Sequence, residues 1–164
     1  MPIKTAKVTG RRELQFHNIE DIQAEVERLA SAEIRTLGNW SPGQIYWHLA
    51  KVMNDSIDGS AMRLSWFMRM LGRLFKGRML NRPMPAGVKL PKAAAEVVEP
   101  PPTTLEQGLE LYRTALRRQL TETNREPSPF LGQMTREEWT QLHCRHAELH
   151  LGFLIPDSDG RSTN

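Results

Sequence analysis

The chain has 164 residues, of which 39% are hydrophobic and 25% are charged, and its net charge is +3. This composition predicts one soluble globular domain with a core of its own, and no apolar run is long enough to span a bilayer. A weakly basic balance is a poor argument for nucleic acid, so we expect neither nucleic acid nor a membrane as a partner. Because Cys144 is the only cysteine and the start of the chain lacks a signal-like apolar segment, we expect a cytoplasmic protein.

The first half of the chain contains two amphipathic helical patterns. Residues 1–17 show no clear period and predict an extended lead-in. Asn18 is suited to cap a helix that continues to about residue 34, with apolar residues at helical spacing. Ser41 and Gln44 predict a capping box at the start of a second helix. His48 lies near the middle of this helix, on its apolar stripe.

The middle of the chain contains a helical segment followed by a proline-rich one. Residues 60–80 have a helical pattern with basic residues on one side and an apolar side, which we expect to cover the other helices. Residues 81–103 are rich in proline and predict a long surface connection. We find no convincing pair of strands anywhere in the sequence.

Two further helices follow this connection. Thr103 or Thr104 is expected to cap the first of them, and Thr135 with Glu138 predicts a capping box for the second. Pro156 and the polar residues after it are expected to end the last helix.

Together, these patterns predict an all-α fold, a four-helix bundle with a long crossover between its second and third helices. The crossover holds an extra helix and the proline-rich loop, and it allows the third bundle helix to return parallel to the second. We expect one domain over residues 1–164, with the bundle over about 18–155 and a polar tail over 156–164.

Three histidines share one side of the last helix. His146 and His150 lie about 40° apart around the helix, and His143 is close to the same stripe. Buried imidazoles need partners for their nitrogens, and a metal ion is one such partner. Because His48 lies at a suitable depth in the second helix, it can meet His146 and His150 in the core.

Three neutral imidazoles with an open fourth position are typical of catalytic rather than structural metal sites. Imidazole suits zinc, nickel, copper and iron alike. His143 is open to three interpretations: a residue that supports the metal ligands, a fourth ligand, or a core histidine bonded to a backbone carbonyl. We favour the first. Asp55 is a candidate to accept the second N–H of His48. Histidines that simply pack in the core are the alternative to any metal site.

Other candidate residues are less specific. Cys144 points away from His146 around the helix, so we do not expect a nucleophile or a ligand. His17 is expected on the surface, and Tyr112 is a possible pocket residue. Trp47, next to His48, could line the entrance of a pocket.

Three segments, WSPGQIYWHLAKVMNDSIDG, PFLGQMTREEW and LHCRHAELHLGFL, resemble the DinB-like (DinB/YfiT-like) metalloenzyme superfamily, in a bacterial branch known only as a domain of unknown function. The resemblance implies a DinB-like bundle in which His48, His146 and His150 hold one divalent ion, commonly nickel or zinc. Relatives include S-transferases that use low-molecular-weight thiols and maleylpyruvate isomerases, and they are often homodimers. Leu149 replaces a histidine that is frequent in this branch, and Phe153 and Leu154 replace a Gln-Phe pair, which leaves the substrate open.

The favoured function is therefore a metal-dependent enzyme, a thiol-dependent S-transferase that acts on a small electrophile. A hydrolase-like activity is the other reaction that such a metal site allows. One alternative is a non-catalytic metal-binding or structural bundle. Another is a module whose basic helix, over Arg63 to Arg78, binds anionic lipid or nucleic acid.

Overall fold

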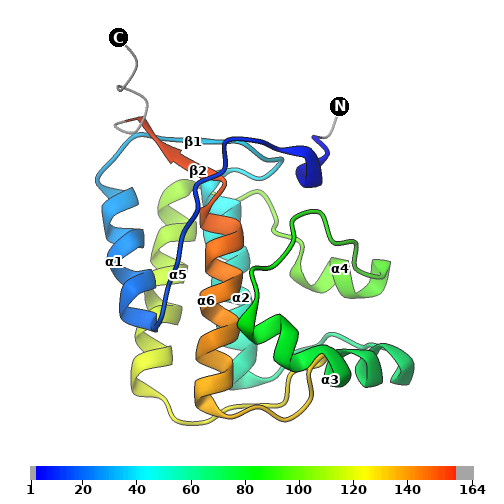
Figure 1. Ribbon diagram of the computed structural model, residues 1–164. Helices are drawn as coiled ribbons and strands as arrows, with labels where there is room; N and C mark the ends of the chain where they lie inside the picture. Colours follow the sequence, from blue (N-terminus) through cyan, green and yellow to red (C-terminus); the bar gives the residue numbers. More distant parts are fainter. Residues whose placement is uncertain (1–2, 158–164) are drawn as a thin grey trace.

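The computed structural model describes residues 3–157, and the protein is mainly helical. Four helices lie side by side (Figure 1): α1 (Ile19–Ala30), α2 (Pro42–Asp58), α5 (Leu105–Thr121) and α6 (Arg136–Leu151). The connection between α2 and α5 carries two more, α3 (Trp66–Asn81) and α4 (Lys92–Val98). A short 3-10 helix, η1 (Thr5–Lys7), lies near the start, and two strands, β1 (Ile34–Thr36) and β2 (Leu154–Pro156), form an antiparallel pair.

The helix starts follow from local sequence. The side chain of Asn18 accepts from the backbone of α1, and Ser41, Thr104 and Thr135 each form a complete capping box with the residue three positions later. Each box satisfies backbone N–H groups that the first turn of a helix leaves without partners. The predicted caps are therefore confirmed, with Thr104 rather than Thr103 at the start of α5.

The core lies among α1, α2, α5 and α6, where their apolar stripes face one another. Helices α2 and α5 run parallel, as predicted, because Gly43 contacts Gly108 near their first turns and Met53 contacts Gln119 near their ends. A Cβ built on Gly108 would lie 2.2 Å from the carbonyl oxygen of Gly43, so the two backbones touch. The largest fully buried side chains include Ile22, Leu29, Tyr46, Leu49, Met53, Tyr112, Leu116, Leu151 and Leu154.

The strand pair corrects the prediction that the chain has no convincing strands. Ile34 pairs with Pro156, and Thr36 pairs with Leu154. As a result α1 ends at Ala30 rather than near residue 34, and Pro156 is a buried strand residue rather than the start of a tail. Strands of three residues are too short for a period of two to be recognised. Residues 158–164 of the predicted tail lie outside the described part of the chain.

The connection also differs from the prediction. Helix α3 begins only at Trp66, after an N-cap at Ser65, and the proline-rich part contains α4, which buries Ala94 and Val98. The apolar side of α3 covers the other helices only at its C-terminal end, where Leu80 and Met79 join an apolar cluster that includes Trp139 and Leu142 of α6. Only Gly72 and Leu80 of this helix are buried, whereas several of its large apolar side chains are exposed. None of the helices within residues 3–157 has the length and apolar content needed to cross a membrane.

Candidate metal centre

His48, His146 and His150 come together between α2 and α6. One ring nitrogen from each lies within 4.8 Å of the others, and the three rings are packed edge to face with centroids 4.6 to 4.9 Å apart. His48 is buried, with 6% of its surface exposed, while His146 and His150 are partly exposed. The cluster therefore lies at the edge of the core, close enough together to bind a metal ion and within reach of solvent.

A backbone carbonyl fixes the tautomer of His48. Its Nδ1 lies 2.8 Å from the carbonyl oxygen of Val98, the last residue of α4. Since a carbonyl can only accept, Nδ1 must carry the hydrogen, and the neutral ring then presents the lone pair of Nε2. That lone pair faces Nε2 of His146 at 3.1 Å. A ligating histidine commonly donates its other N–H in this way.

The spacing of these nitrogens suits a metal ion. Two imidazole nitrogens bound to one tetrahedral zinc at about 2.0–2.1 Å are about 3.3 Å apart. The Nε2 atoms of His48 and His146 are 3.1 Å apart. The donor set is entirely imidazole, which suits zinc, nickel, copper or iron, so the residues present fit a divalent transition metal without selecting one.

Burial favours the neutral form of the three rings. Burial is the largest cause that lowers the pKa of His48, His146 and His150, and the neighbouring rings lower the pKa of His146 and His150 further. The hydrogen bond to Val98 acts in the opposite direction on His48. Neutral imidazole is the form that can bind a metal ion.

Trp40 completes the site, although no sequence pattern indicated this role. Its ring stacks on His150 with centroids 5.5 Å apart and lies 4.8 Å from the ring of His48. The strand pair holds the segment before α2 against the end of α6, with the backbone N–H of Leu37 donating to the carbonyl of Phe153. Trp47 was a candidate to line the entrance, but Trp40 is the tryptophan whose ring contacts His48 and His150. Sequence adjacency to His48 was therefore the wrong criterion.

His143 belongs to a different polar cluster. Ser56 donates its hydroxyl hydrogen to the carbonyl of Met53 and so accepts from Nε2 of His143 at 3.2 Å and from Gln119 at 2.9 Å. The ring of His143 also stacks on Trp139. Within residues 3–157 it is not part of the metal-binding group. It joins α2, α5 and α6 as a satisfied core histidine, bonded to a hydroxyl rather than to a backbone carbonyl.

The predicted role of Asp55 is also corrected. Both carboxylate oxygens of Asp55 accept from Lys51, and one accepts from Ser60. The acceptor for His48 is instead the carbonyl of Val98, which comes from a segment 50 residues away. A backbone carbonyl has no side-chain identity, so no sequence pattern could have pointed to it.

The other candidates lie away from the histidines. Cys144 is buried, its thiol faces the carbonyl of Asn18, and burial raises its pKa to about 11, which makes it a poor nucleophile. Tyr112 is fully buried and stacks on Tyr46. His17 is exposed beside Asp21, as predicted.

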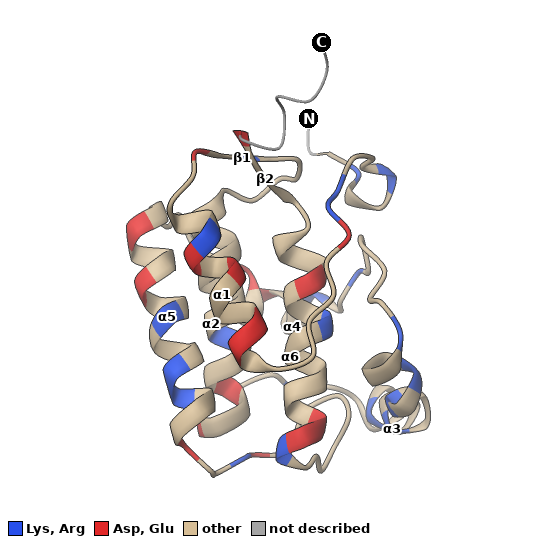
Figure 2. Ribbon diagram, turned by 60° about the vertical axis from the view of Figure 1, so that its left-hand side comes forward, with Lys and Arg blue, Asp and Glu red and all other residues tan. Residues whose placement is uncertain are grey.

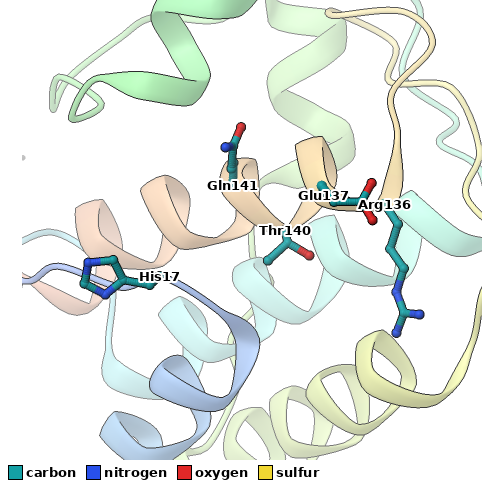
Figure 3. Close-up of a pocket in the computed structure, with 5 residues that line it drawn as sticks. All are labelled: His17, Arg136, Glu137, Thr140 and Gln141. Carbon is teal, nitrogen blue, oxygen red and sulfur yellow. The ribbon is translucent and has the colours of Figure 1, made fainter.

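Neither of two hollows on the surface is lined by the three histidines. One, shown in Figure 3, lies along α6 and the segment before α1 and is lined by His17, Arg136, Glu137, Thr140 and Gln141. Its side chains diverge rather than converge on one point, so it has no arrangement of a binding site. The other lies on α3. Within residues 3–157, the histidine cluster is the group of His, Cys, Asp and Glu side chains that lies close enough together to hold a metal ion.

The geometry defines a class of protein, a helical protein with a three-histidine cluster able to bind a metal ion. Residues 8–157 match the family described as protein of unknown function (DUF1569), so the chain belongs to this family. No curated protein and no solved structure matches the chain.

Proposed function

We propose that this protein binds one divalent metal ion, nickel or zinc, through His48, His146 and His150, and that it is a metal-dependent enzyme. The observation that carries the proposal is the pair of Nε2 atoms of His48 and His146, 3.1 Å apart, with Nδ1 of His48 committed to Val98. Without an ion, one of two facing imidazole nitrogens must carry the hydrogen that the pair shares. A cation would instead satisfy both lone pairs.

The site has the composition of a catalytic centre. Three histidines leave at least one coordination position for another molecule, and His146 and His150 are partly exposed. A divalent ion held there would act as a Lewis acid and would lower the pKa of a bound water or thiol. Trp40 covers His150 and limits the approach of water from its side.

The reaction that we favour is the transfer of a low-molecular-weight thiol to a small electrophile. The support for this choice is the resemblance to DinB-like S-transferases and the buried, unreactive Cys144, which leaves the nucleophile to a co-substrate. A non-catalytic metal-binding bundle is the alternative. The resemblance also supports our proposals of a DinB-like four-helix fold and a homodimer. The length of the chain supports one domain over residues 1–164, and its single cysteine supports a cytoplasmic location.

Metal content tests the site. We expect about one equivalent of nickel or zinc in the untagged wild-type protein after loading and dialysis, because three imidazoles hold a transition metal through dialysis. The variants His48→Ala and His150→Ala should lose the ion while keeping the helical circular dichroism of the wild type. The matched control is His17→Ala, which removes an exposed histidine and should keep the ion. A wild type that takes up no nickel, zinc or copper would show that the cluster consists of core histidines.

Activity separates an enzyme from a non-catalytic metal protein. Metal-loaded protein should consume thiol and electrophile together in a panel of low-molecular-weight thiols and activated electrophiles, and the metal-free protein should not. Full metal loading with no turnover of any pair would support the non-catalytic alternative.

A further inference from the structure

Helix α3 carries large apolar side chains that nothing in residues 3–157 covers. Trp66 is 74% exposed and Leu74 is 75% exposed, and Phe67 and Met70 are about half exposed. Trp66, Met70 and Leu74 are spaced four residues apart, so they form one stripe along the helix with Phe67 beside it. These four residues are called the α3 apolar stripe below.

The opposite side of α3 is fixed to the protein, so the stripe cannot turn inward. A Cβ on Gly72 would lie 2.1 Å from the carbonyl oxygen of Phe130, which means that the helix touches the backbone of the α5–α6 connection there. Lys76 donates to the carbonyl of Gln133 and to Glu138 on α6. Gly72 lies about 160–200° around the helix from Met70 and Leu74, so these contacts direct the stripe away from the other helices.

Positive charge borders the stripe on both sides. Arg69 and Arg73 follow one edge and Arg78 the other, at helical angles of about 60–100° from Met70. All three are exposed, and none forms an ion pair with a residue of the described chain. Residues 60–82 contain six cationic residues and no acidic one, although the whole chain has a net charge of only +3. Figure 2 shows basic residues and no acidic ones on α3.

A shallow hollow joins the two kinds of side chain. It has a volume of about 360 Å³ and is lined by Trp66, Arg69, Met70 and Arg73. Two guanidinium groups beside an aromatic ring and a thioether offer hydrogen bonds to a phosphate next to a surface for hydrocarbon.

We propose that α3 binds the surface of an anionic lipid bilayer, with the α3 apolar stripe in the acyl region and its flanking arginines at the phosphate groups. An in-plane amphipathic helix with Trp, Phe and Leu on one face and basic residues at its edges has this form. Helix α3 lies across the direction of the neighbouring long helices (Figure 1), so it can meet a flat surface along its length. This inference is independent of the metal site, and it replaces the expectation, drawn from the net charge, that the protein has no membrane partner.

Two other occupants fit the observations less well. A nucleic acid would pair with the arginines but would leave Met70 and Leu74 without apolar contacts. A second copy of the chain would bring the arginine edges of two α3 helices together, and like charges across an interface cost binding energy.

Vesicle binding tests the proposal. We expect the full chain to sediment with vesicles of phosphatidylcholine and phosphatidylglycerol, to bind vesicles of phosphatidylcholine alone at least tenfold more weakly, and to lose affinity as salt is added. Trp66 fluorescence should shift to shorter wavelength on binding, and the shift should disappear in Trp66→Phe.

Three kinds of variant assign the effect to this surface. Leu74→Ser should weaken binding about tenfold, because a leucine side chain leaves the hydrocarbon. Arg69→Gln and Arg78→Gln should each weaken it about fivefold. Gly77→Leu should strengthen vesicle binding, because Gly77 lies on the same exposed side of α3 as the α3 apolar stripe and nothing lies within 4 Å of an added Cβ. The matched control is Leu111→Ser, the same substitution of an exposed leucine on α5, which should leave vesicle binding unchanged.

Three outcomes would overturn the proposal of an anionic bilayer. Failure to bind either vesicle, or equal binding to both, excludes an anionic bilayer. Binding to an oligonucleotide that is unchanged in Leu74→Ser, without vesicle binding, would assign the arginines to nucleic acid. Self-association that Leu74→Ser abolishes, again without vesicle binding, would make the stripe an interface between copies.

Discussion

His48 illustrates how one side chain acquires a defined chemical role from its surroundings. On an apolar helix face the ring could adopt either tautomer. The carbonyl of Val98 selects the tautomer with hydrogen on Nδ1 and so directs the Nε2 lone pair to His146. The acceptor is a backbone carbonyl, so no substitution of the Val98 side chain removes it. The hydrogen bond leaves the Nε2 lone pair of His48 available to a metal ion.

Trp40 should influence metal affinity without binding the ion. Because its ring stacks on His150 and lies beside His48, we expect Trp40→Leu to lower the affinity for nickel or zinc about tenfold in a competition titration with a chelator. Trp66→Leu, which changes a distant exposed tryptophan, should bind the metal like the wild type. Equal affinity of wild type and Trp40→Leu would show that the ring only packs against the site.

His143 should make the protein sensitive to acid. Burial lowers its pKa to about 3, whereas an unfolded histidine titrates near pH 6.5. Between these values the unfolded chain binds a proton that the folded chain does not. The stability contributed by the neutral ring is therefore complete above about pH 6.5 and is lost as the pH falls toward 3.

Urea unfolding of His143→Gln measures this contribution. From about pH 6 to about pH 4 the free energy of unfolding should fall less steeply in the variant than in the wild type, by about 1.4 kcal/mol per pH unit. His17→Gln, the same substitution at an exposed histidine, is the control. Parallel slopes for wild type and His143→Gln would mean that the folded protein binds a proton at His143 in this range.

At the scale of elements, the contact between α2 and α5 depends on two glycines. Gly108→Ala would place a Cβ 2.2 Å from the carbonyl oxygen of Gly43, so the helices must separate. We expect a loss of about 1–3 kcal/mol in the free energy of unfolding, measured in urea. Gly77→Ala is the control, since the added methyl group meets nothing within 4 Å and should stabilise α3 by about 0.5–1 kcal/mol. A neutral Gly108→Ala would show that this contact is loose.

The two-stranded sheet shows how a small element positions a functional residue. Its six residues connect the end of α6 to the segment before α2 and thereby place Trp40 over His150. Neither strand has a recognisable pattern, because three residues give one full alternation at most. Arg12 strengthens the same junction by donating to the carbonyls of Leu151 and Leu154 and pairing with Glu25. Residues 1–17, which contain Arg12, have no local sequence pattern that predicts this role.

At the scale of the whole molecule, the long crossover between α2 and α5 serves two separate places. Its α4 end supplies the carbonyl that orients His48, and its α3 presents the apolar stripe and arginines to solvent. The sequence predicts that the basic helix of this crossover covers the other helices and that its proline-rich part is a surface connection. In the structure, α4 contacts the histidine cluster, and α3 carries the proposed membrane surface.

Local sequence was enough to predict the long helices, most of their caps and the three histidines that cluster. Capping and helical periodicity act between residues at most a few turns apart, so a single segment contains the whole signal. The choice of histidines also followed from spacing on one helix, with His48 added by its depth on another.

Tertiary packing alone decided the partners of those histidines and the exposed side of α3. Val98 is 50 residues from His48, and Trp40 is brought to His150 by the pairing of β1, between α1 and α2, with β2, after α6. An amphipathic pattern shows that α3 has an apolar face, but it does not show what that face contacts. Contacts between distant segments depend on how the helices pack together, and no local pattern records that arrangement.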